Sequence, residues 1–143
     1  MTKILVINGP NINLLGEREP EIYGGITYDT LCQNLVQQGL EEGFDVECFQ
    51  SNHEGDLIDK IQAERHNAHA FIINPGALTH YSYALYDCIR SVVPPFIEVH
   101  ISNVHQREEF RHKSLIAPAC QGSIVGLGVT GYHLALEYLM KSL

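Results

Sequence analysis

Short apolar runs that alternate with amphipathic segments limit the fold of this chain more than any other feature. Each run is five to seven residues long, which is typical of a strand buried in a sheet. The runs occupy residues 3–8, 44–50, 70–74, 96–102 and 123–128. The segments between them carry apolar residues at helical spacing, over residues 27–43, 54–67, 80–92 and 131–143. Five predicted strands therefore alternate with helices.

This alternation predicts an α/β domain with a doubly wound, five-stranded parallel sheet of the flavodoxin-like type. Most of the strands are apolar throughout, as expected when helices cover both faces of a parallel sheet. With 143 residues the chain is long enough for a single core, and we expect residues 1–143 to form a single domain. In such folds, ligands bind outside the carboxyl ends of the strands.

Composition excludes several classes of protein. Apolar residues make up 45% of the chain and charged residues 18%, which argues against disorder. The net charge of −8 argues against nucleic acid as a partner. The first apolar run is too short for a signal peptide, and no segment is long enough to span a membrane. Cys32, Cys48, Cys88 and Cys120 form no CxxC pair, so we expect buried free thiols in a cytoplasmic protein.

Polar residues, together with Gly76, collect where the predicted strands end. They are Asn8, Asn11, Asn13, Arg18 and Tyr23 after the first strand, Ser51, Asn52 and His53 after the second, Asn74, Gly76, Thr79 and His80 after the third, and Glu98, His100 and Ser102 toward the end of the fourth. Four of the nine cationic residues, Arg18, Arg107, Arg111 and Lys113, lie in the same loops. This local cationic cluster on an acidic chain suits a small anion such as a carboxylate.

The segment GEREPEIYGG, residues 16–25, has neither helical nor strand periodicity, and it places Tyr23 five residues after Arg18. A surface loop whose tyrosine packs on the protein body is one interpretation. The other is a tyrosine that acts as a base, although a free phenol has a pKa of about 10. A guanidinium about 4 Å away contributes on the order of 4 kcal/mol, or roughly three pKa units, against which desolvation acts. The residues alone leave both interpretations open.

Glu98 and His100 are two residues apart on a predicted strand and therefore share a face. They form either a structural hydrogen-bonded pair or a general acid whose tautomer is set by the carboxylate. A metal site would add His80 and His105, but that spacing is a weak ligand pattern. His80 and Asp87 are seven residues apart on a predicted helix, which places them on one face.

The segment GLGVTG, residues 126–131, matches the GxGxxG pattern of dinucleotide-binding proteins. The chain ends twelve residues later, without a second strand and its acidic residue, so close packing of helix on strand explains the glycines better. A flavin- or nucleotide-binding module of the flavodoxin type also needs a phosphate loop after the first strand. NGPNINLLG, residues 8–16, lacks the serines and threonines of such a loop.

Together, five segments resemble the type II 3-dehydroquinate dehydratases, and the match covers nearly the whole chain. The segments are NGPNINLLGEREPEIYG (8–24), QSNHEGDLID (50–59), NPGALTHYSYAL (74–85), PFIEVHISNVHQREEFRHKS (95–114) and GLGVTGYHLAL (126–136). The resemblance implies dehydration of 3-dehydroquinate to 3-dehydroshikimate in the shikimate or quinate pathway, without a metal or cofactor. Of the four lysines, none lies at a predicted strand end facing the site, which argues against the Schiff-base chemistry of type I dehydroquinases.

The resemblance also implies roles for individual residues. Tyr23 falls on the base, Arg18 on the arginine that lowers its pKa, His100 on the general acid, Glu98 on the carboxylate that orients it, and Asn11 on a residue that stabilises the enolate. The residues that fall on substrate-binding positions are Asn74, His80, Asp87 and Arg111, with Ile101 and Ser102 where amides and a hydroxyl hold the carboxylate. We expect Gly16, Gly24 and Gly25 to let the loop close over the substrate.

The family usually assembles as a dodecamer of four trimers. The residue that matches Asp87 reaches into the site of a neighbouring subunit. The resemblance therefore implies a homo-oligomer that binds a small anionic substrate, with neither nucleic acid nor membrane as a partner.

Overall fold

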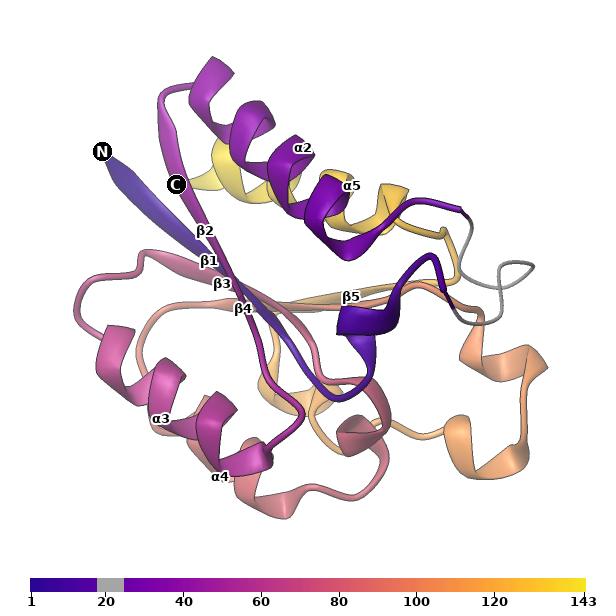
Figure 1. The fold of residues 1–143 in the computed structure, drawn as a ribbon. Coiled ribbons are helices and arrows are strands. Elements are labelled where there is room, and N and C mark those ends of the chain that lie inside the picture. Colours follow the sequence, from indigo (N-terminus) through magenta and orange to yellow (C-terminus); the bar gives the residue numbers. More distant parts are fainter. Residues whose placement is uncertain (18–24) are drawn as a thin grey trace.

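A parallel sheet runs through the middle of the molecule, with helices packed against both of its faces (Figure 1). The computed structural model describes residues 1–17 and 25–143. The strands are β1 (Thr2–Asn8), β2 (Phe44–Gln50), β3 (Ala70–Asn74), β4 (Phe96–His100) and β5 (Gly122–Val125). They follow the order β2-β1-β3-β4-β5, and every neighbouring pair is parallel. The predicted doubly wound sheet of the flavodoxin-like type is confirmed.

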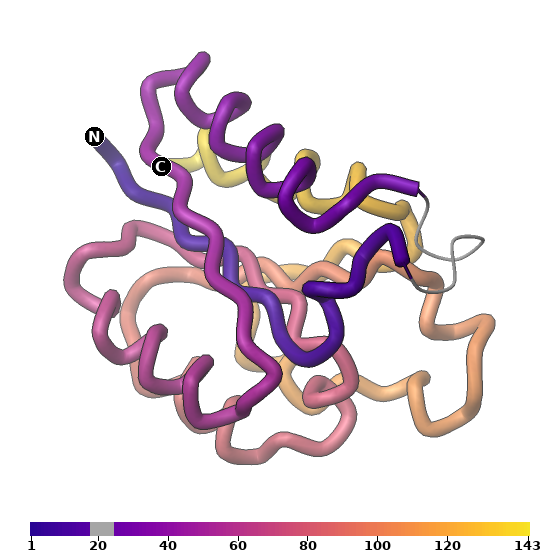
Figure 2. Tube along the Cα trace, in the orientation of Figure 1, coloured from indigo at the N-terminus to yellow at the C-terminus, as the bar shows by residue number. Residues whose placement is uncertain are grey.

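Helices form a layer on each face of this sheet. α2 (Tyr28–Glu41) and α5 (Thr130–Ser142) lie side by side on one face, and α3 (Glu54–Glu64) and α4 (Tyr83–Arg90) on the other, as Figure 2 also shows. Short 3-10 turns are η1 (Ile12–Leu14), η2 (Gly76–His80), η3 (Val104–Gln106), η4 (Glu109–Arg111) and η5 (Ala117–Ala119). None of the helices in the described residues is long and apolar enough to cross a membrane.

Alternate residues of β1 point to opposite faces of the sheet, and both sets are fully buried. Ile4 and Val6 belong to the core beneath α2 and α5, whereas Leu5 and Ile7 belong to the core beneath α3 and α4. Because both faces of the strand are packed with apolar side chains, its polar residues lie at its two ends, with Thr2 and Lys3 at the amino end and the buried Asn8 at the carboxyl end. Asn8 thus lies at the edge of the sheet where the strands end.

The helix predicted over residues 80–92 begins later than expected. Ser82 caps α4, and its hydroxyl accepts a hydrogen bond from the Leu85 amide at 3.0 Å. His80 instead ends η2. The prediction that His80 and Asp87 share one face of one helix is therefore wrong, because the serine cap separates them.

The strands predicted over residues 96–102 and 123–128 end two to three residues earlier than expected. β4 ends at His100, and β5 ends just before Gly126, whose φ of +86° is incompatible with a strand. The third glycine of the GxGxxG pattern, Gly131, lies in α5. A Cβ there would lie within 3.4 Å of side chains on both β4 and β5, so close helix–strand packing is confirmed.

The four cysteines are free thiols, as predicted. Only Cys88 is buried, however, while Cys32, Cys48 and Cys120 are half-buried. The expectation of full burial is wrong for these three. At the start of α2, Thr27 is the N-cap, because its hydroxyl accepts a hydrogen bond from the amide of Thr30 at 3.2 Å.

The turns after β1 and β3 pack backbone against backbone. The amide of Gly9 donates to the carbonyl of Asn74 at 2.8 Å, and a Cβ on Gly9 would collide with the carbonyl oxygen of Pro75. In the opposing turn Gly76 has a φ of +61°, and a Cβ there would lie 3.0 Å from the Pro10 carbonyl oxygen. These two turns form one wall of the site described below.

We predict that Gly9→Ala lowers the free energy of unfolding by about 1–3 kcal/mol, since the added methyl must push the two turns apart. The matched control is Gly55→Ala in α3, where a Cβ meets no atom within 4 Å. Removing a helical glycine there should stabilise the protein by roughly 0.5–1 kcal/mol. Urea unfolding at a fixed protein concentration measures both, and equal midpoints for the two variants would contradict the close approach.

Candidate active site

The turns that follow β1, β3 and β4 enclose a cavity of about 100 Å³ at the carboxyl edge of the sheet. Seven of the predicted site residues line it, namely Asn11, Asn74, His80, His100, Ile101, Ser102 and Arg111. Glu98 lies directly behind His100. Asp87 does not reach the cavity, and Arg18 and Tyr23 lie outside the described residues.

Asn11 lies on the cavity wall in a left-handed conformation, with φ of 72°. It is the one non-glycine residue with positive φ in residues 1–17 and 25–143. Asparagine tolerates this conformation better than most residues. Its amide donates to the Asn52 side-chain oxygen at 2.9 Å, and that same oxygen accepts from Gln50 at 3.1 Å. The loop after β2 therefore holds the backbone of Asn11 in place.

His100 and Glu98 form a buried hydrogen-bonded pair at the end of β4. The distance from His100 Nε2 to Glu98 Oε2 is 2.5 Å. Burial works to raise the pKa of Glu98, but hydrogen bonds from His100, Thr79 and Ser114 outweigh it and hold the pKa below its ordinary value. Glu98 is therefore ionised at neutral pH and accepts the Nε2 proton of His100. Within the described residues, Nδ1 of His100 has no hydrogen-bond partner and remains available for chemistry.

His80 is held by a backbone carbonyl. Its Nδ1 lies 2.8 Å from the carbonyl oxygen of Lys113. A carbonyl can only accept, so Nδ1 carries the proton and Nε2 of the neutral ring is an acceptor. Burial lowers the pKa of His80, and the nearby His100 and Arg111 lower it further against the raising effect of the Lys113 carbonyl. At neutral pH His80 can accept a hydrogen bond from a ligand hydroxyl.

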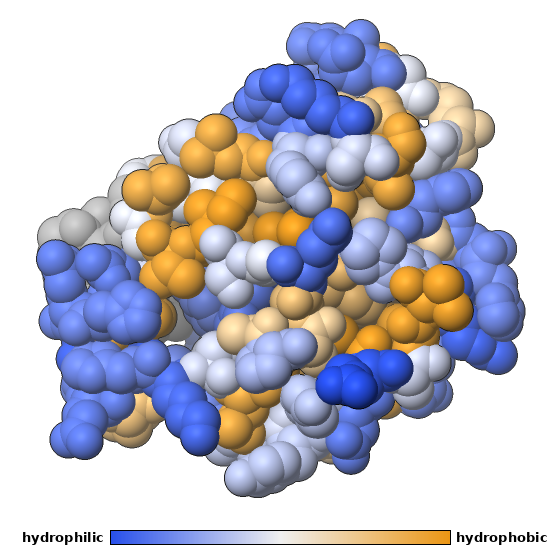
Figure 3. Space-filling model, turned by 180° about the vertical axis from the view of Figure 1, so that it is seen from behind, coloured by the Kyte–Doolittle hydropathy of each residue, from blue (hydrophilic) through white to orange (hydrophobic). Residues whose placement is uncertain are grey.

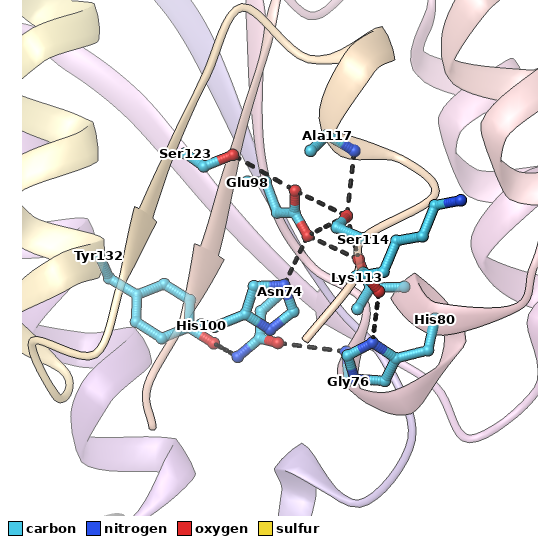
Figure 4. A network of polar contacts seen from close by, with 11 residues as sticks. Asn74, Gly76, His80, Glu98, His100, Lys113, Ser114, Ala117, Ser123 and Tyr132 are labelled. Carbon is cyan, nitrogen blue, oxygen red and sulfur yellow. Dashed lines mark hydrogen bonds and ion pairs between the residues drawn. The ribbon is translucent and has the colours of Figure 1, made fainter. Parts of the chain in front are cut away.

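A fully buried tyrosine, Tyr132 of α5, orients Asn74 (Figure 4). Its hydroxyl accepts from Asn74 Nδ2 at 2.8 Å and donates to Asn8 Oδ1 at 2.6 Å. The amide of Gly76 donates to Asn74 Oδ1 at 3.1 Å. Sequence reasoning missed Tyr132, although a tyrosine on the apolar face of a helix needs a partner for its hydroxyl and so signals a polar contact in the core.

Two guanidinium groups line the cavity. Arg107 donates to the Ser102 hydroxyl at 3.2 Å. Arg111 is paired with Glu108 at 2.6 Å and lies 4.7 Å from the centre of the Phe110 ring. Two of the four predicted cations are thus brought to the site, which suits a carboxylate.

None of the four lysines, Lys3, Lys60, Lys113 and Lys141, lines the cavity. Three of them are paired with glutamates elsewhere in the molecule. In residues 1–17 and 25–143, no three histidine, cysteine or acidic side chains are grouped to hold a metal ion. His80, considered above as a ligand, instead bonds the Lys113 carbonyl.

The ends of the segment that carries Arg18 and Tyr23 lie close together. Gly16 has a φ of +90°, and a Cβ there would lie 2.7 Å from the carbonyl oxygen of Ile26. A glycine is therefore required at this position. Gly25 has open space around it, and Gly24 lies outside the described residues.

The fold and the cavity define a flavodoxin-like α/β protein with a cavity lined by two histidines and two arginines at the carboxyl edge of its sheet. Residues 2–140 match the family model described as dehydroquinase class II. The chain belongs to the class II dehydroquinase family.

The chain is also similar to individual members of this family over nearly the whole length of both chains. The chain is 58% identical to the 3-dehydroquinate dehydratase of Caldicellulosiruptor bescii, over 100% of this chain and 99% of the relative. The type II dehydroquinase of Butyrivibrio crossotus is 53% identical, with a TM-score of 0.94 over 96% of this chain and 97% of that one. The type II dehydroquinase of Propionibacterium acnes is 45% identical, with a TM-score of 0.95 over 99% and 97% of the two chains.

We predict that Tyr132→Phe lowers the free energy of unfolding by about 1–3 kcal/mol, since Asn74 Nδ2 and Asn8 Oδ1 both lose the buried hydroxyl to which they are bonded. The control is Tyr138→Phe, because Tyr138 is 45% exposed and its hydroxyl accepts from the exposed Gln121, its one side-chain partner in the described residues. We expect that change to stay within about 0.5 kcal/mol. Equal unfolding free energies of the two variants would show that the buried hydroxyl contributes nothing.

Proposed function

We propose that the protein is a 3-dehydroquinate dehydratase, which removes water from 3-dehydroquinate to give 3-dehydroshikimate through an enolate. The observation that carries the proposal is the buried His100–Glu98 pair, with its 2.5 Å hydrogen bond, at a cavity that also holds Arg107 and Arg111. The family match supports it, as do relatives that bear this name at more than half identity. The reaction is a carbon–oxygen lyase reaction, and its proposed steps need no cofactor or metal.

The first step is removal of a proton next to the substrate ketone. We assign the base to Tyr23 and the lowering of its pKa to Arg18, on the family resemblance of residues 8–24. The carbon–hydrogen electron pair moves onto the ketone oxygen, and the enolate that forms needs a hydrogen-bond donor. Asn11 is assigned to that role, acting through a bound water, and its position on the cavity wall supports the assignment.

The second step expels the hydroxyl on the carbon beyond the enolate. The electron pair on the enolate oxygen re-forms the ketone, and the enolate double-bond pair forms the new carbon–carbon double bond as the carbon–oxygen bond breaks. His100 gives a proton to the leaving oxygen, so that water departs. Glu98 keeps the Nε2 proton of His100 in place, which makes Nδ1 the nitrogen that donates. The 2.5 Å hydrogen bond between the two side chains supports this assignment.

The remaining assignments concern substrate binding. The Ile101 amide and the Ser102 hydroxyl are assigned to the substrate carboxylate, with Arg107 bonded to Ser102 at 3.2 Å. Asn74, His80 and Arg111 are assigned to the hydroxyl and carbonyl groups of the ring. A neutral His80 with a free Nε2 suits a hydroxyl donor.

Assembly belongs to the same proposal. We propose a dodecamer of four trimers in which Asp87 completes a neighbouring subunit's site. Asp87 is exposed on α4 and bonds to no other side chain in the described residues. Large apolar side chains near it in sequence are also exposed, with Tyr81 at 62% and Tyr83 at 72%. Apolar groups also remain uncovered on the face that Figure 3 shows, as expected of a subunit.

We place the enzyme in the cytoplasm, in the shikimate or quinate pathway. Free thiols support a reducing compartment. The net charge of −8 and the absence of a membrane-spanning helix in the described residues are compatible with this placement.

The function is tested by following the ultraviolet absorbance of the conjugated enone product, with 3-dehydroquinate as substrate and a chelator present. We expect wild type and the control Tyr138→Phe to produce it at equal rates. Tyr23→Phe and His100→Ala should each lose at least about 100-fold in kcat, as expected for a lost base or acid. Substantial turnover by Tyr23→Phe would exclude it as the base. No product from the folded wild-type oligomer would overturn the function.

The cross-subunit role of Asp87 is tested by complementation. Asp87→Ala alone should raise KM about tenfold or more, since a hydrogen bond to a charged group is lost. When Asp87→Ala and His100→Ala subunits are co-expressed, hybrid oligomers should regain activity, because some sites combine an intact Asp87 with an intact His100. Asp59→Ala, on the exposed face of α3, is the matched control. Normal mass by light scattering, with normal kinetics of Asp87→Ala, would contradict the role.

A further inference from the structure

The carboxylate of Glu98 is enclosed by three hydroxyl groups besides His100 (Figure 4). Thr79 donates to Oε2 at 2.6 Å. Ser114 lies 2.8 Å from Oε2 and 3.1 Å from Oε1, and Ser123 lies 3.3 Å from Oε1. These hydroxyls come from three separate parts of the chain: η2, the segment before η5, and β5.

The surrounding backbone fixes the positions of the Ser114 and Thr79 hydroxyls. The amide of Ala117 donates to the Ser114 oxygen at 3.0 Å, so the hydroxyl proton of Ser114 points away from that amide, to the side where Glu98 Oε2 and the Thr79 hydroxyl each lie 2.8 Å away. The carbonyl of Thr79 accepts from the amide of Leu115 at 2.7 Å, which ties η2 to the segment that carries Ser114. An ionised carboxylate can only accept hydrogen bonds, so hydroxyl donors suit the ionised form of Glu98 better than the protonated form.

The three hydroxyls offset the cost of burying the Glu98 carboxylate in its ionised form. Glu98 is 1% exposed, and a carboxylate taken out of water favours its neutral form. A neutral Glu98 would carry its own proton toward Nε2 and leave His100 as a neutral ring, which is a weak acid. An ionised Glu98 instead stabilises a ring protonated on both nitrogens. The state of the carboxylate therefore decides the strength of the acid.

We propose that Ser114 and Thr79, with Ser123 as a weaker third donor, are positioning residues that hold Glu98 as an anion so that His100 presents an acidic Nδ1 proton to the leaving hydroxyl. This inference rests on the proposed function of His100. In the step it supports, the Nδ1 proton passes to the departing oxygen to form water, while the Nε2 proton stays on the ring, bonded to Glu98. The hydroxyls themselves do not touch the substrate.

Other titratable groups lie near Glu98 but do not bond to it within the described residues. His80 of η2 lies on the cavity side, and burial together with the charge of Glu98 raises the pKa of the Cys120 thiol to about 12. His105 and His112 line a neighbouring cavity of about 220 Å³, which Ser114 also lines. None of these four groups bonds to the carboxylate in the part of the chain that the structure describes, whereas the His100 ring does.

The pH profile of kcat tests the proposal. Ser114→Ala removes the donor to both oxygens, so the pKa of Glu98 should rise. Since Glu98 must be ionised, activity should then be lost at higher pH as the solution is acidified. We expect the acidic limb to move up by about one pH unit, so that kcat at a fixed pH on that limb falls up to roughly tenfold, while kcat at pH 7 and KM change less than about threefold.

Conservative and control variants separate this role from a structural one. Ser114→Thr keeps the hydroxyl, and the neighbouring cavity has room for the added methyl group. This variant should therefore have the acidic limb and the kcat of wild type. Thr79→Val should behave like Ser114→Ala, whereas Ser123→Ala should have a smaller effect because its contact is longer. Ser91→Ala, which removes an exposed hydroxyl bonded to the Cys88 carbonyl, should match wild type.

A second readout does not depend on turnover. With ¹⁵N-labelled histidine and no substrate, the proton on Nε2 of His100 should resonate far downfield in wild type, and move in Ser114→Ala and Thr79→Val but not in Ser91→Ala. An unmoved resonance together with an unmoved acidic limb in the two variants would overturn the proposal. Wild type that makes no enone product, yet shows these shifts, would refute the proposed function and leave the role of the hydroxyls standing.

Discussion

Burial of the sheet on both faces is the constraint on which the rest of the structure depends. Each central strand must fill two cores, so alternate residues of β1 are apolar on either side. A polar side chain in the middle of such a strand has no water to bond with. The groups that do chemistry are therefore found where the strands end and the turns begin, at the edge that holds the cavity.

Glu98 is an exception, because it is a charged side chain in the middle of a buried strand, where its burial costs free energy. It lies on β4, paired in register with Ile73 and Ser123 of the two neighbouring strands, and is almost completely buried. An unpaired carboxylate there would be neutral or would destabilise the fold. His100 and the hydroxyls of Thr79, Ser114 and Ser123 satisfy it instead. One of the contacts that make the burial tolerable also fixes the position of the His100 ring at the cavity.

A second buried hydrogen-bond network joins the ends of β1 and β3 to α5. Asn8 and Asn74 stand side by side at the ends of β1 and β3, and the hydroxyl of Tyr132 bridges their amides from α5. The contact joins the last helix of the chain to its first strand. It explains how a helix without any residue in the cavity lining still helps to shape the site, because the amide it orients forms part of the wall.

The sequence by itself determined the order of strands and helices, the parallel sheet and most of the residues at its carboxyl edge. Those follow from periodicity and from where apolar runs stop, which are local properties of the chain. Helix and strand ends were less predictable, since a serine cap at Ser82 and a positive φ at Gly126 override the apolar pattern. Only the tertiary structure decided that Tyr132 orients Asn74 and that Thr79, Ser114 and Ser123 surround Glu98. Those residues are far apart along the chain, and hydrogen bonds of 2.6–3.3 Å depend on how the elements pack, which no local pattern encodes.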